Sequence, residues 1–114
     1  MIKDRAFKNC DNIEKIIFNN NIQYIGDEAF MNCCNLKEIV FPSSINYIGN
    51  AAFKSCTNLT KISFNCNNIF IGNNSFMYCS SLKHIKFPIN VSYFGSNLLE
   101  RCYNLESVIL PENI

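Results

Sequence analysis

The sequence contains no tryptophan, a single histidine and no pair of cysteines spaced as C-x-x-C. Structural zinc sites combine several cysteines or histidines at short spacings, so a lone His84 indicates no metal site. Glycine-rich phosphate loops and the G-x-S-x-G nucleophile elbow are also missing, and Asp27 and Glu28 stand in expected turns without an arranged partner. We therefore expect a protein that is not an enzyme, with no catalytic residues, no cofactor and no bound metal.

An excess of one charge and a long apolar run are equally absent. The 114 residues carry a formal net charge of +1, which gives no reason to expect nucleic acid as the partner. Hydrophobic residues make up 48% of the chain but are dispersed, and no run approaches the roughly 18 apolar residues of a membrane-spanning helix. The N-terminus, MIKDRAFKNC, lacks the apolar core of a secretory signal. We expect neither nucleic-acid binding nor membrane insertion.

What the sequence does contain is a strict repeat, whose unit is typified by the stretch from Ile25 to Tyr47 and begins again at Ile48. Phenylalanine, glycine and proline each recur in a fixed column of this repeat. The columns are Phe7, Phe30, Phe53, Phe76 and Leu99 for the aromatic position, Gly26, Gly49, Gly72 and Gly95 for glycine, and Pro42, Pro88 and Pro111 for proline. Such periodicity identifies a solenoid in which each unit buries its apolar face against its neighbours.

The repeat also predicts the domain organisation. Residues 1–114 form a single segment of about five units, too short for two ordinary domains. The pattern starts and stops within a unit, and neither end has the polar character of a solenoid cap. This indicates part of a longer array without its caps, and the uncapped ends predict end-to-end self-association.

The seven cysteines follow the same repeat. Five of them occupy one column, namely Cys10, Cys33, Cys56, Cys79 and Cys102. Because unpaired cysteine behaves as a small hydrophobe, this column predicts a buried ladder of free thiols. Disulfides between neighbouring rungs, or a metal site, are the alternatives. Of the vicinal pair Cys33 and Cys34, we expect one side chain to point inward and the other outward.

Each unit divides into a strand and a return segment. Residues 36–41, LKEIVF, have the alternation of a half-buried strand that ends before Pro42. In the return segment Gly49 predicts a sharp turn or a close backbone approach, and the residues AAFKSC that follow predict one or two helical turns. A further aromatic column favours packing between units over a recognition stripe; it contains Tyr24, Tyr47, Phe70 and Tyr93.

The unit L-x-x-I-x-F-P-x-x-I-x-x-I-G-x-x-A-F-x-x-C runs from Leu36 to Cys56 and, with replacements such as Leu98 and Leu99, from Leu82 to Cys102. It resembles the BspA-like leucine-rich repeat over essentially the whole chain. The resemblance implies a right-handed leucine-rich-repeat superhelix with a concave parallel β-sheet and short helical, irregular or strand segments on the convex side. The chain departs from the pattern at two places. Lys3 replaces glycine, and Asn68 occupies an isoleucine column, where we expect Ile69 to shift inward and fill the place.

The same resemblance implies a non-catalytic protein-binding module, of the kind that surface proteins use in adhesion or in contact with a host. The chain would then lie at the cell surface or outside the cell and bind a protein ligand. One alternative is an intracellular protein-protein interaction scaffold in the cytoplasm, which reduced cysteines and the missing signal favour. Another is a structural array that assembles itself through open ends.

Outward strand positions predict where such a ligand would bind. The candidates on the concave face are Lys15, Ile17, Glu38, Val40, Lys61, Ser63, His84, Lys86 and Ile109. A basic spot gathers Lys61, Lys83, His84 and Lys86. It is either an ordinary solvated face or a contact for an acidic partner, with the apolar candidates as neighbouring anchors.

Overall fold

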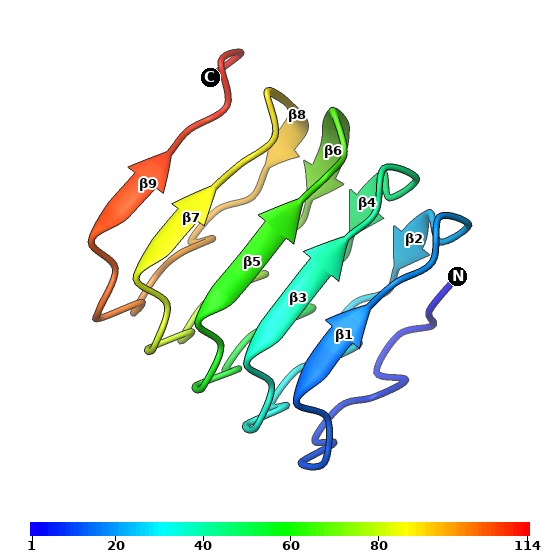
Figure 1. Cartoon of the computed structure of the whole chain (residues 1–114), viewed down its shortest axis with the longest axis vertical. Helices are drawn as coiled ribbons and strands as arrows, with labels where there is room; N and C mark the ends of the chain where they lie inside the picture. Colours follow the sequence, from blue (N-terminus) through cyan, green and yellow to red (C-terminus); the bar gives the residue numbers. More distant parts are fainter.

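The computed structural model describes the whole chain, Met1–Ile114, as a coil with nine short strands and no helix (Figure 1). The front face carries β1 (Lys15–Ile17), β3 (Glu38–Phe41), β5 (Lys61–Phe64), β7 (His84–Lys86) and β9 (Ser107–Ile109). The back face carries β2 (Tyr24–Ile25), β4 (Tyr47–Ile48), β6 (Asn68–Ile71) and β8 (Asn90–Phe94). No element is therefore a helix able to cross a membrane.

All strands pair in parallel, and the pairing advances by one repeat. Lys15 lies opposite Glu38, and Glu38 lies opposite Lys61, which are equivalent positions of successive units. On the back face β2, β4, β6 and β8 form one continuous sheet in that order. Each repeat is thus one turn of a solenoid, and the predicted fold with its parallel sheet is confirmed. The return side consists of short strands and turns.

The expected helical turns after the glycine column are wrong, and the backbone shows why. Ala51 and Ser55 have positive φ angles of 54° and 63°, which interrupt a right-handed helix. Between these two residues, successive backbone amides donate hydrogen bonds alternately to the next turn and back within the same turn. The Phe53 amide donates to the Ser75 carbonyl of the next turn at 2.8 Å, whereas the Lys54 amide donates back to Ala51 at 3.2 Å. Backbone hydrogen bonds between neighbouring turns therefore take the place of the hydrogen bonds within a helix. A helix of this length would not be stable alone.

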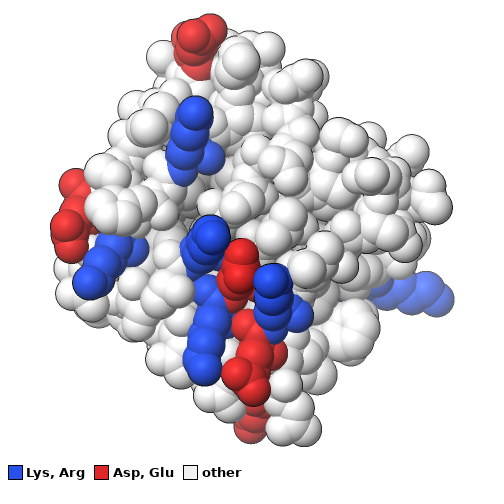
Figure 2. All heavy atoms as spheres, viewed as in Figure 1, with Lys and Arg blue, Asp and Glu red and all other residues white.

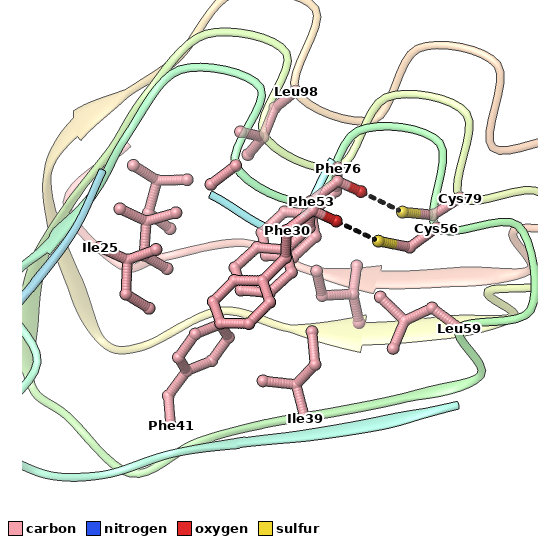
Figure 3. Packing of buried hydrophobic residues seen from close by; sticks show 14 of the residues in the cluster. Ile25, Phe30, Ile39, Phe41, Phe53, Cys56, Leu59, Phe76, Cys79 and Leu98 are labelled. Atoms are coloured by element: carbon pink, nitrogen blue, oxygen red, sulfur yellow. Dashed lines mark hydrogen bonds between the residues drawn. The ribbon is translucent and has the colours of Figure 1, made fainter. Parts of the chain in front are cut away.

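The core is built on stacked phenylalanine rings (Figure 3). Phe53 is fully buried, and its ring lies nearly parallel to Phe30 and Phe76, with centroids 5.2 and 5.5 Å away. A second stack pairs Phe41 with Phe64 at 5.0 Å and meets the first edge to face, where Phe41 contacts Phe53 at 5.6 Å. Because each turn adds a ring at the same place, one column of the sequence becomes a continuous apolar column in space.

The cysteine column forms the predicted ladder of free thiols. Cys33, Cys56 and Cys79 are fully buried and unpaired. The Cys56 thiol donates to the Phe30 carbonyl at 3.3 Å, and three other members of the column make the same bond one turn away (Figure 3). Burial raises the pKa of Cys33 to about 11 and raises the pKa of the other two as well. Cys34 is exposed, so the vicinal pair divides inward and outward as expected.

The regularity fails between β5 and β7, which belong to separate sheets. One turn earlier, the Thr60 amide donates to the Lys37 carbonyl at 3.0 Å, but Lys83 makes no such bond to Thr60. The unit that contains β5 also departs from the repeat, with Asn65 in the proline column and Asn68 in an isoleucine column. There Ile69 is buried and Asn68 is exposed, as predicted, and the pairing of β6 with β8 shifts register directly after Ile69.

Candidate functional site

The nine predicted ligand-binding residues all lie on the front strands. They are Lys15, Ile17, Glu38, Val40, Lys61, Ser63, His84, Lys86 and Ile109. In β3 the alternation is clear, since Ile39 and Phe41 are buried while Glu38 and Val40 reach solvent. Equivalent positions of adjacent turns therefore form outward columns, with the strands about 4.8 Å apart.

Charges alternate in sign along the first of these columns. The Glu38 carboxylate lies 3.4 Å from Lys15 Nζ and 3.8 Å from Lys61 Nζ. Beside it, Lys37 Nζ lies 3.3 Å from the Glu14 carboxylate. Figure 2 shows acidic and basic side chains interleaved on this part of the front face. Glu38 thus partly neutralises Lys61, and the predicted basic spot is smaller than its sequence indicates.

The remaining members of the basic spot have no acidic partner. Neither Lys83 nor Lys86 lies within ion-pair distance of a carboxylate. His84 Nδ1 lies 2.7 Å from Ser107 Oγ on the next front strand, a contact that reading within one unit missed. A serine beside a histidine becomes a nucleophile when a third group orients the ring and donors stabilise the oxyanion. No such carboxylate contacts His84, and both residues are exposed, so the pair is a solvent-accessible polar contact between neighbouring strands.

The second outward column is apolar at both ends of the front face. Ile17 is 66% exposed and Ile109 is 55% exposed, while Val40 is half-buried. Ile109 pairs directly with Lys86, so one predicted apolar anchor does adjoin the basic spot. A ligand lying across β7 and β9 would meet a positive charge and an aliphatic side chain together.

A cleft of about 430 Å³ opens where β5 and β7 end. Its walls come from the last residues of these strands and from the turns that follow them. The lining residues are Ile62, Ser63, Phe64, Asn65, Cys66, Asn67, Lys86, Phe87, Pro88 and Ile89. Two of the predicted site residues, Ser63 and Lys86, lie in this cleft, and the other seven do not. The cleft adjoins the interruption between the two sheets.

The cleft was not predicted from the sequence, although the sequence contains a signal for it. The segment NCNN at residues 65–68 replaces the pattern that begins with proline in three other units. Asn65 stands in the proline column, and Cys66 lies outside the cysteine column. In the structure Cys66 is buried at the cleft while Asn65 and Asn67 are exposed on its rim. A unit that breaks several columns at once marks a local change in geometry.

The aromatic column on the back face serves packing. Tyr24 stacks on Tyr47 at 4.3 Å, Tyr47 stacks on Phe70 at 4.6 Å, and Phe70 stacks on Tyr93 at 4.7 Å between centroids. The ring planes differ by at most 18°, so each inner ring has both flat faces covered by its neighbours. For these inner rings only the edges remain for solvent, so a ligand that stacks on aromatic faces would find open faces only at the two ends of the column. The expectation of packing is confirmed.

Carboxylates in the turns have partners, contrary to the sequence-based expectation. Asp27 Oδ1 accepts the Asn50 amide of the next turn at 2.9 Å, and Glu28 Oε1 lies 2.8 Å from Lys8 Nζ. The hydrogen bond from Lys8 lowers the pKa of Glu28. No three His, Cys, Asp or Glu side chains come together in a metal-binding arrangement. Asp27 and Glu28 therefore connect turns of the solenoid.

Comparison with known proteins gives two matches. The family model described as the BspA type leucine rich repeat region matches residues 1–114 with six copies. A crystal structure of a leucine-rich repeat protein from Bacteroides ovatus ATCC 8483 is similar to the fold, with a TM-score of 0.67 and 24% sequence identity. That similarity covers all of this chain and 36% of the other. No curated protein sequence matches the chain.

Proposed function

Because this chain belongs to the BspA-type leucine-rich repeat family, we propose that it is a non-catalytic module that binds a protein partner on its front sheet. One observation carries the proposal. The outward side chains of the front strands, fixed by a buried core on their other side, form ordered columns of mixed charge and exposed aliphatic groups. Such a preformed surface binds without an ordering cost in the backbone.

A photo-cross-linking amino acid tests where the partner lies. It would replace Val40 on the front face and, as the matched control, exposed Asn46 beside the back sheet, in the full-length protein within the cells that produce it. We expect a discrete adduct from position 40 and none from position 46. Equal adducts from both positions, or none from either, would argue against a binding surface on the front sheet.

Charge reversal tests whether the basic residues take part. Lys61→Glu and Lys86→Glu together would place two negative charges where an acidic partner is expected to contact the front sheet. Loss of the position-40 adduct supports an acidic partner surface. An unchanged adduct would remove these two lysines from the binding surface and leave the rest of the sheet as its candidate.

A cell-surface role in adhesion or host contact is the finer proposal, and family membership supports it. The alternative is an intracellular scaffold that uses the same face. Protease added to intact cells separates the two, because it digests only an exposed array. Digestion favours the surface role. Protection alongside a cytosolic control, with digestion after lysis, favours the scaffold.

Self-assembly through the ends is a second candidate function. The first and last turns expose apolar side chains, among them Phe7 at 41% and Leu110 at 55%. A heterologous contact between such ends would extend into open chains of subunits. Light scattering of the 114-residue chain over a range of concentrations tests this. Growth of the mass with concentration supports assembly, and a constant monomer mass excludes it.

A further inference from the structure

We infer that the cleft between the ends of β5 and β7 binds a short acidic peptide segment of the protein partner, with an aliphatic side chain in the cleft and a neighbouring carboxylate on Lys86. This inference rests on the proposed function and assigns it a particular site. It goes beyond a general charge attraction because it requires one apolar contact and one ionic contact at a fixed separation. Its evidence is the shape, the lining and the charge of the cleft.

The shape comes from the interruption of the front sheet. Elsewhere on this face, backbone hydrogen bonds join neighbouring turns. One example is the bond that the Lys37 amide donates to the Glu14 carbonyl at 2.7 Å. The corresponding bond between Lys83 and Thr60 is missing, and β5 and β7 do not belong to one sheet. The space of about 430 Å³ at their ends lies within the range of small-ligand sites and would accept one or two side chains.

The lining provides an apolar wall and unused polar groups. Phe64 and Ile89 line it, and Ile89 is 56% exposed, so its aliphatic side chain is open to contact by a ligand. The side chains of Ser63, Asn65 and Asn67 also line the cleft and make no hydrogen bond within the protein. Hydroxyl and amide groups of this kind can pair with the backbone of an extended peptide.

The charge of the lining residues favours a negatively charged ligand. None of the ten lining residues is acidic, and Lys86 is the one that carries a formal charge. Lys86 is exposed and forms no ion pair. His84 lies two residues before it on β7, and its ring contacts only Ser107 among hydrogen-bonding groups. A carboxylate placed at the rim would therefore meet an unpaired ammonium group. The acidic residue Glu112, whose amide donates to the Ile89 carbonyl at 2.8 Å, lies on the next turn and outside the lining.

Two synthetic peptides test the inference on the 114-residue chain. The acidic probe is acetylated and amidated GLELEG, and the matched basic probe is GLKLKG with the same termini. Amide resonances of the isotope-labelled protein are followed by NMR as each probe is added to about 2 mM, so that a Kd near 1 mM is measurable. The variants are Lys86→Glu in the cleft and Lys3→Glu as the control, which makes the same charge change at an exposed residue outside both the lining and the basic spot.

We expect the acidic probe to shift the amides of Ser63, Asn67 and Ile89, and the basic probe to leave them unmoved. Lys86→Glu should weaken binding about tenfold, while Lys3→Glu should change it less than about twofold. No shift at the cleft, or equal weakening by both variants, overturns the inference. Absence of peptide binding together with a persisting adduct at position 40 would reject this site alone and keep the front-sheet function.

A second pair of variants carries the test to the partner itself. Ile89 and Ile109 are 56% and 55% exposed, so replacing either with aspartate removes a similar aliphatic surface. In the full-length protein, Ile89→Asp should abolish the position-40 adduct, and Ile109→Asp should reduce it less. The reverse order would place the apolar contact on β9 and overturn the assignment to the cleft.

Discussion

A Cβ atom on Gly49 would lie 2.6 Å from the backbone nitrogen of Asp27, one turn earlier in the solenoid. The same holds for Gly26, where the Cβ would lie 2.5 Å from the Asp4 nitrogen. No glycine in the chain has a positive φ angle. Of the two roles expected from the sequence, the close approach between turns is therefore confirmed, and a turn that requires glycine is not found.

Gly49→Ala should destabilise the protein by about 1–3 kcal/mol, because backbone atoms, which cannot rotate away, surround the added methyl group. Urea unfolding followed by far-ultraviolet circular dichroism measures the change. An unaltered midpoint would show that neighbouring turns can separate by several tenths of an ångström without loss. That outcome would refute the close approach as the reason for this column.

Ala51→Gly should have the opposite effect. Ala51 has a φ angle of 54°, and relief of left-handed strain of about 1–2 kcal/mol exceeds the added backbone entropy of glycine, about 0.5–1 kcal/mol. We expect a gain of roughly 0.5–1 kcal/mol in the free energy of unfolding by the same measurement. The control is Ala52→Gly, at a buried neighbour whose φ is not positive, which should destabilise.

Much of the fold was predictable because each column of the sequence becomes a physical column in the solenoid. The strands, the stacked rings and the thiol ladder all follow from equivalent positions of successive repeat units. The left-handed residues were harder to recognise, since Ala51 and Ser55 carry no signature of that conformation. Equivalent residues in other turns do carry such a signature. Asn32 and Asn74 also have positive φ angles, and asparagine adopts this conformation more readily than most residues.

Phe53→Ala should cost about 3–5 kcal/mol, since the ring is fully buried between two others and opposite a third. Phe7→Ala is the matched control. Phe7 stacks on Phe30 at 5.1 Å but is 41% exposed, so its loss should cost about half as much or less. Thermal and urea unfolding of both variants would test the order. Equal losses would mean that stacking, and not burial, sets the stability of the column.

The candidate site was predictable only in part. Alternation along the strands placed the outward residues, and comparing equivalent positions of neighbouring units would also have found Glu38 between Lys15 and Lys61. The cleft depends on how far two strands separate after an irregular turn. Replacement of proline by Asn65 signals that the turn differs, but it does not fix the separation of β5 from β7.

Stability should fall in acid through Glu28. Its pKa is lowered, first by the Lys8 hydrogen bond, so the ionised form is favoured in the folded state. The contribution is complete above the unfolded pKa, near 4.5, and is lost as the pH falls through the lower folded pKa. Both side chains are about one-third exposed, so we expect only about 0.5 kcal/mol. Glu28→Gln should lose this at pH 7 and match the parent near pH 2; an equal deficit at both would refute an ionic origin.

Stability should also fall in alkali through the thiol ladder. Burial raises the pKa of Cys33 from 9.0 to about 11, so the folded state keeps a proton that the unfolded state releases within this window. The stabilisation is therefore complete below pH 9 and declines by up to about 1.4 kcal/mol per pH unit as the pH rises towards 11. Urea unfolding at pH 8, 9 and 10 with a reductant present would measure this slope. Cys33→Ala should reduce the slope by the share of this one thiol, because Cys56 and Cys79 remain, whereas Cys34→Ala, which removes the exposed neighbour, should leave it unchanged. If the two variants had the same slope as the parent, alkaline destabilisation would have to arise from other groups, such as Tyr47, whose pKa burial also raises.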